Sequence, residues 1–183
     1  MELFKTKSTP NLSSSFIDGA NINYADVAWL LTSSSFVLLM TPGLSFFYGG
    51  MVGKKNVIST MLQSFISLGV VSLLWVVIGF SLSFGSSIGF TINGETYGVF
   101  GNPLDFMFFD NVSTFPHKNL ASTIPFILFA LFQMKFAVIT PAIITGSFAE
   151  RVRFIGYLFF ICLFTFNFFN FFFFGGFFML VYY

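Results

Sequence analysis

The residues with the clearest chemical potential lie together between positions 132 and 136. Lys135 is the only charged residue of the stretch 119–149, and Gln133 stands beside it. Phe132 and Phe136 are four residues apart, so in a helix they share one face. Aromatic faces attract desolvated cations by ~2 kcal/mol or more. The four residues are therefore a candidate cation site, although in a chain with 32 phenylalanines the two rings are also ordinary packing residues.

Little else in the chain could perform catalysis or bind a metal. Cys162 is the only cysteine and His117 the only histidine, which excludes a disulfide framework and any metal site built from several of these residues. We find no nucleophile–base pair and no phosphate-binding loop. We therefore expect no enzyme, no catalytic residue, no metal and no cofactor. His117 is expected to be a solvated residue of a polar loop.

The composition indicates a polytopic membrane protein. Hydrophobic residues make up 56% of the 183 residues and charged residues only 8%, whereas soluble domains have about 25% charged residues. The net charge is +1, too small for a protein that binds nucleic acid through a basic surface. The expected partner of such an apolar protein is the lipid bilayer.

The spacing of the charges divides the chain into membrane spans. A helix needs roughly 20 apolar residues to cross the hydrocarbon layer. The fold class that follows is an all-α polytopic membrane protein with about four transmembrane helices. The predicted spans are about 27–49, 57–82, 121–148 and 154–176.

Lys135 lies near the middle of the third span. A charge at the centre of a bilayer costs at least ~2.5–3.5 kcal/mol, so its side chain should face protein or a water-filled vestibule. Pairing with an acid on another helix is an alternative, but every acidic residue lies at or beyond the end of a span.

Basic residues in short loops predict the orientation. Lys54 and Lys55 separate the first two spans, and Arg151 and Arg153 separate the last two. These loops should be cytoplasmic, which makes residues 1–26 an extracellular amino-terminal tail. The sequons at Asn11 and Asn111 then fall on the outer side as possible glycosylation sites.

Several blocks of sequence, in this order and spacing, resemble the ammonium transporter (Amt/Mep/Rh) family. They include residues 40–52 (MTPGLSFFYGGMV), 55–65 (KNVISTMLQSF) and 132–154 (FQMKFAVITPAIITGSFAERVRF). The resemblance covers about residues 24–165, which would be the amino-terminal part of the family's eleven-helix bundle.

The resemblance implies a function and a site. Family members are homotrimers that recruit ammonium, with methylammonium as an analogue, at an outer vestibule and pass ammonia through an apolar pore. Phe132 matches the vestibule phenylalanine and Phe136 one of the two that gate the pore. Gln133 and Lys135 lie in the same motif, and no role is carried onto them. A multi-pass protein of the plasma membrane with an extracellular amino terminus is expected.

The resemblance ends in a segment of low complexity. Residues 166–183 are rich in phenylalanine, and we interpret them as a tail that is not native family sequence. Residues 27–165 would then be an incomplete transporter domain. Because the family's pore lies between two halves, the alternative function is a truncated, non-transporting membrane protein, either a pseudogene product or a partner subunit.

Overall fold

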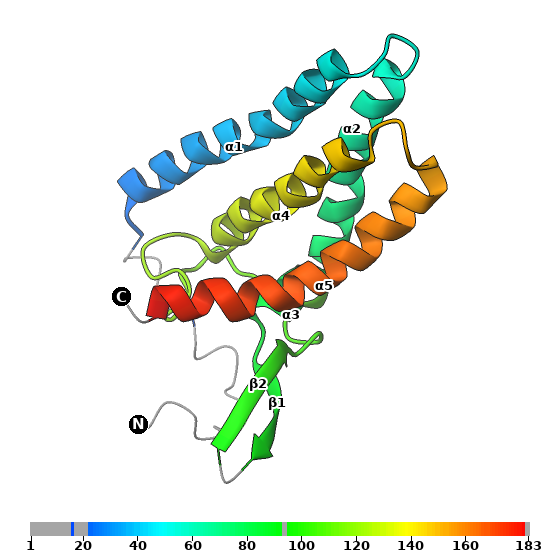
Figure 1. The fold of residues 1–183 in the computed structure, drawn as a ribbon. Helices are drawn as coiled ribbons and strands as arrows, with labels where there is room; N and C mark the ends of the chain where they lie inside the picture. The colour runs from blue at the N-terminus through cyan, green and yellow to red at the C-terminus, as the bar shows by residue number, and fades with distance from the viewer. Residues whose placement is uncertain (1–15, 17–21, 93–94, 182–183) are drawn as a thin grey trace.

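The computed structural model describes residue 16 and residues 22–92 and 95–181, and Figure 1 shows their arrangement. Asn11 lies outside the described residues, as does most of the predicted tail 1–26. Of residues 168–181 the description covers the backbone alone. The spans form the helical part of the fold, and a small hairpin lies at one end of it.

Four long helical segments account for most of the chain, which confirms the all-α membrane fold. The second segment is continuous but changes its hydrogen-bond pattern, since a π-helical turn interrupts it. Three segments are long and apolar enough to cross a membrane: 24–51, 57–84 and 126–148. The helices are α1 (Tyr24–Met51), α2 (Val57–Leu74), η3 (Trp75–Gly79), α3 (Phe80–Phe84), α4 (Phe126–Phe148) and α5 (Phe154–Val181).

The helix ends differ from the predicted spans by a few residues. Helix α1 begins earlier, because the side chain of Asn23 accepts a hydrogen bond from the Ala25 N–H and caps it. Helix α4 begins at Phe126, directly after Pro125. Pro42 and Pro141 lie inside α1 and α4, and both helices continue through them.

Helix α4 is the central element of the bundle. It packs against α1, α2 and α5, and in Figure 1 it lies between α1 and α5. The α1–α2 and α4–α5 connections lie at the same end of the bundle, and the hairpin lies at the opposite end. The two short loops therefore reach the same membrane surface.

Aromatic residues form the core at the hairpin end. Phe80 and Phe126 are fully buried with ring centroids 5.4 Å apart. The centroid of Phe106 lies 5.5 Å from each of them, with its ring tilted to Phe80 and edge to face with Phe126. Trp75, also buried, donates from its indole Nε1 to the Ala130 carbonyl at 3.2 Å. These contacts fix the hairpin end of α4 against the second span.

The loop between the second and third spans contains an antiparallel hairpin that the sequence did not predict. It comprises β1 (Ser87–Ile92) and β2 (Glu95–Gly101). At its base the Asp105 carboxylate accepts from the Ser86 N–H and from the Asn102 amide, both at 2.7 Å. A Cβ at Gly101 would collide with the carbonyl oxygen of Leu82, so only glycine fits where β2 meets α3.

Candidate functional site

The candidate site is a stripe of large side chains along α4. At 100° per residue, Phe132, Phe136, Ile143 and Ser147 fall within about 60° of one another around the helix. The rings of Phe132 and Phe136 meet edge to face, with centroids 5.0 Å apart and planes at 73°. The structure thus brings the two predicted site residues into contact.

The other described helices leave this stripe only partly covered. The opposite side of α4 packs into the bundle, and its buried residues include Ala130, Ala137 and Thr145. In contrast, 43% of Phe136 and 50% of Ile143 is exposed. The two aromatic residues therefore do not belong to the core formed by the described helices.

Lys135 and Gln133 flank the stripe on its two sides. Both side chains are half-buried. Among the described residues Lys135 has no ion pair, so the alternative in which it pairs with an acid finds no support within this part of the chain. Their role stays open.

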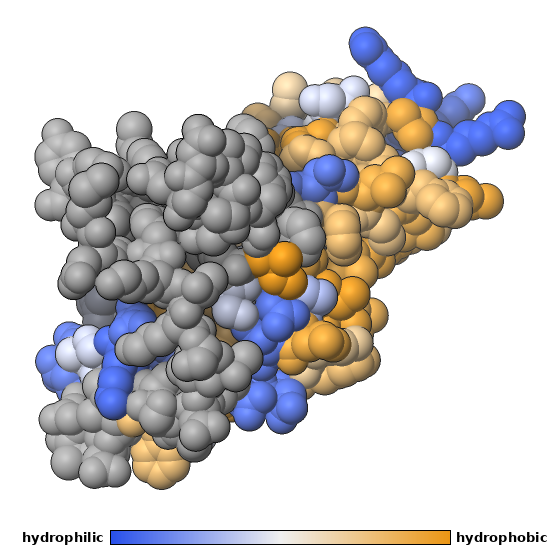
Figure 2. All heavy atoms as spheres, turned by 90° about the horizontal axis from the view of Figure 1, so that it is seen from below, coloured by the Kyte–Doolittle hydropathy of each residue, from blue (hydrophilic) through white to orange (hydrophobic). Residues whose placement is uncertain are grey.

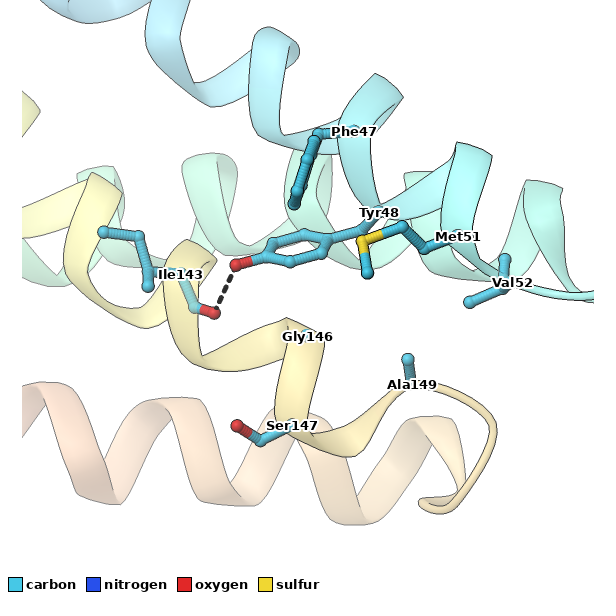
Figure 3. Close-up of a pocket in the computed structure, with 8 residues that line it drawn as sticks. All are labelled: Phe47, Tyr48, Met51, Val52, Ile143, Gly146, Ser147 and Ala149. Carbon is cyan, nitrogen blue, oxygen red and sulfur yellow. Dashed lines mark hydrogen bonds between the residues drawn. The ribbon is translucent and has the colours of Figure 1, made fainter.

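The carboxy-terminal end of the stripe borders an open pocket between α1 and α4. Its volume is about 370 Å³, and Figure 3 shows the side chains around it. The Tyr48 hydroxyl donates to the Ile143 carbonyl at 2.8 Å. The ring lies so close to Gly146 that a Cβ there would be 2.5 Å from Cε1. The lining residues are Phe47, Tyr48, Met51, Val52, Ile143, Gly146, Ser147 and Ala149.

A carboxylate ties the two short loops together beyond this pocket. One oxygen of Glu150 accepts from the Gly53 N–H at 3.0 Å and from the Asn56 side-chain amide at 3.1 Å. The Asn56 and Gly53 hydrogen bonds stabilise the charged form and hold the pKa of Glu150 below its usual value. The α1–α2 connection is thereby fixed to the α4–α5 connection.

The structure corrects the expectation for His117, which is buried rather than solvated. Only 8% of it is exposed, and its ring stacks on Phe126 at 4.9 Å. Its Nδ1 accepts from the Leu120 N–H at 3.3 Å, and its backbone bridges to Phe16 and Ala121. Burial lowers the pKa of this imidazole from 6.5. The lone histidine thus packs the loop between the second and third spans onto α4.

Asn111, one of the two predicted glycosylation sites, is exposed and lies in a left-handed backbone conformation with φ of 59°. Its side-chain amide donates to the Asp105 carbonyl at 3.4 Å. No group of three or more metal-ligating residues exists within the described part of the chain.

Comparison with known proteins identifies the family. The model of the Ammonium Transporter Family matches residues 28–181. The chain belongs to the ammonium transporter family. The match extends to residue 181, beyond residue 165 where the resemblance was expected to end, and so includes most of the phenylalanine-rich segment.

Relatives and solved structures of the ammonium transporter family agree with this assignment. The ammonium transporter of Bacillus subtilis is 45% identical over 138 residues, or 74% of this chain and 31% of that protein. The ammonium transporter of Mycobacterium tuberculosis is 39% identical over 148 residues, covering 74% of this chain and 29% of that protein. The crystal structure of Saccharomyces cerevisiae Mep2 superposes with a TM-score of 0.62 at 29% identity, over 85% of this chain and 31% of that one.

This family member spans about a third of the length of the curated relatives that it matches. Phe132 and Phe136 were found from spacing and motif. Sequence reasoning did not single out Tyr48, Gly146 or Glu150, although all three lie in the blocks that carry the family resemblance. Only the fold shows that these blocks meet at one end of the bundle.

Proposed function

We propose that the chain supplies one wall of an ammonium-conducting pathway, with the exposed stripe of α4 facing the pathway. The observation that carries this proposal is the edge-to-face pair of Phe132, which is half-buried, and Phe136, which is 43% exposed. A family of ammonium transporters provides the substrate class. No catalytic chemistry is proposed.

Phe132 would recognise ammonium at the outer vestibule. An ammonium ion must lose part of its hydration shell to enter, and an aromatic face replaces part of that attraction. Phe136, the next ring inward along the same face, would act as the gate. The pathway then continues past Ile143, where apolar surroundings penalise the charged ion and favour loss of its proton. Lys135 and Gln133 border this route.

The assembly and location follow from the family and the charge pattern. We propose a homotrimer in the plasma membrane, with the amino terminus and Asn111 outside and the two short basic loops in the cytoplasm. Methylammonium is expected to be a transported analogue. The bilayer is the surrounding partner, because the outward face of α1 carries large apolar side chains such as Trp29, Phe36 and Phe46.

A chimera tests the function directly. Residues 28–165 would replace the matching part of the Bacillus subtilis ammonium transporter, to which the chain is 45% identical over 138 residues. Expressed in yeast cells without their own ammonium transporters, the chimera should restore growth on limiting ammonium and should take up methylammonium. A well-expressed chimera that takes up neither compound would refute the proposed pathway.

The 183-residue chain alone provides the second arm of the test. The stripe of α4 is only one wall, so the purified chain in liposomes should show no ammonium-dependent uptake. If the chimera is inactive and the chain co-purifies with a full-length homologue without transporting, the partner-subunit alternative would replace the proposed function.

A further inference from the structure

Four basic residues gather at one end of the bundle. Lys54 and Lys55 lie in the α1–α2 connection, and Arg151 and Arg153 lie in the α4–α5 connection; all four are exposed. In Figure 2, long hydrophilic side chains project at the right beyond the hydrophobic surface of the helices. We call these four residues the basic patch.

An acidic residue, Glu150, lies next to the basic patch without pairing with its cations. Glu150 directly precedes Arg151, yet its carboxylate accepts from two neutral donors, the Gly53 N–H and the Asn56 amide. Within the described part of the chain, none of the four basic side chains has an ion pair or a hydrogen bond. The carboxylate thus joins the two loops while their cations stay available.

The position of the basic patch matches the headgroup layer of a bilayer. Lys54 lies three residues after the last residue of α1, and Arg153 directly precedes the first residue of α5. Between the two arginines, Val152 is 38% exposed and apolar, as expected for a loop that touches the membrane. Guanidinium groups bind phosphate oxygens through paired hydrogen bonds, whereas lysines act as point charges.

We propose that the basic patch is a docking surface for anionic phospholipid headgroups, and that Glu150 is its positioning residue. The phosphate of the lipid is the recognised group. Glu150 would hold the lysine pair and the arginine pair close enough to act on one headgroup. The proposal goes beyond ammonium conduction and does not depend on it.

The test measures lipid selectivity of the full 183-residue chain. The chain would be reconstituted in phosphatidylcholine with spin-labelled phosphatidylglycerol or spin-labelled phosphatidylcholine, and the motionally restricted fraction of each label would be compared. Each cation near an anionic membrane surface strengthens binding roughly fivefold. K54Q/K55Q and R151Q/R153Q should therefore each remove most of the preference for phosphatidylglycerol. K118Q, in the loop at the other end of the bundle, should not.

Glu150 gives the decisive comparison. E150Q keeps a side-chain oxygen for the Gly53 and Asn56 donors but removes the negative charge, so it should raise the preference for phosphatidylglycerol. E150A removes the same charge and also the link, so it should lower the preference. Circular dichroism would verify equal helix content in every variant.

Three results would overturn the proposal. The first is a wild-type chain with no preference for phosphatidylglycerol at low salt, which would leave an acidic protein as the partner to examine. The second is an equal loss in K118Q. The third is E150A behaving like E150Q, because the charge alone, rather than the link between the loops, would then determine binding.

Discussion

Gly146→Ala should destabilise the contact between α1 and α4. The new Cβ would lie 2.5 Å from Cε1 and 2.8 Å from Cζ of Tyr48, so the ring must move. Inserting a methyl group into such a contact costs about 1–3 kcal/mol. Displacing the ring also breaks the hydroxyl bond to Ile143, at about 1 kcal/mol. Replacing a helical glycine returns about 1 kcal/mol, so the net loss is roughly 1–3 kcal/mol.

Two glycines of α1 provide matched controls. A Cβ at Gly50 meets nothing within 4 Å, so Gly50→Ala should be neutral or stabilising by up to about 1 kcal/mol. At Gly49 the nearest atom is Cγ of Met61 at 2.9 Å, and the flexible methionine can yield. Stability should therefore decrease in the order Gly50→Ala, Gly49→Ala, Gly146→Ala.

The assay is the free energy of unfolding in mixed micelles, followed by circular dichroism during titration with a denaturing detergent. Tyr48→Phe separates the two costs, because it removes only the hydroxyl bond and should lose about 1 kcal/mol. If Gly146→Ala and Gly50→Ala have the same stability, the close packing of Tyr48 on α4 is wrong.

Three further predictions concern the aromatic pair of α4, His117 and the base of the hairpin. In the chimera, Phe132→Ala should weaken apparent ammonium affinity by up to about 30-fold, because it removes a desolvated cation–π contact. Phe136→Ala should alter the transport rate more than the affinity. Unchanged uptake kinetics in both variants would contradict these roles. Because the pKa of His117 is lowered in the folded protein, the unfolded state binds more protons. The free energy of unfolding should therefore be full above about pH 6.5 and fall below it. His117→Phe should remove this pH dependence in thermal melts. Asp105→Ala removes the acceptor of the Ser86 N–H and should speed hydrogen exchange at the base of the hairpin, while exchange in α4 stays unchanged.

The helical fold could be predicted because charge placement in a membrane protein is restrictive. Charged residues are so costly in hydrocarbon that long stretches with at most one charge marked the helices, and the family blocks added their order. The hairpin was missed because its first strand directly follows a span and the serines and glycines there read as an exit turn. Its signals were nevertheless present, since Ile88, Phe90 and Ile92 alternate with smaller residues and Asn93-Gly94 is a typical sequence for a two-residue hairpin turn. The burial of His117 was not predicted because it depends on residues outside its own loop. Phe126 lies in α4, and Phe16 lies about a hundred residues earlier in the chain.

The site was only partly predictable for a different reason. Motif and spacing identified Phe132 and Phe136, but the links made by Tyr48 and Glu150 join residues 94 to 97 positions apart in the chain. A helix–helix contact of this kind has no local signature. It requires the crossing of α1 over the carboxy-terminal end of α4, which no single segment specifies.

Small side chains mark the places where α4 packs most closely against its neighbours. The helix is apolar on every side, so an amphipathic pattern cannot show which side packs. Small residues, Ala130, Ala137 and Ala142, are buried against neighbouring helices, as close packing in membranes requires. Phe136 and Ile143, on the stripe, are exposed, although other large residues of α4 such as Phe126 and Ile139 are buried. Ala137→Leu should therefore disrupt the bundle, whereas Ile143→Leu should leave its unfolding free energy within about 0.5 kcal/mol. Equal effects of the two changes would mean that the stripe is a packing face and not a wall of the pathway.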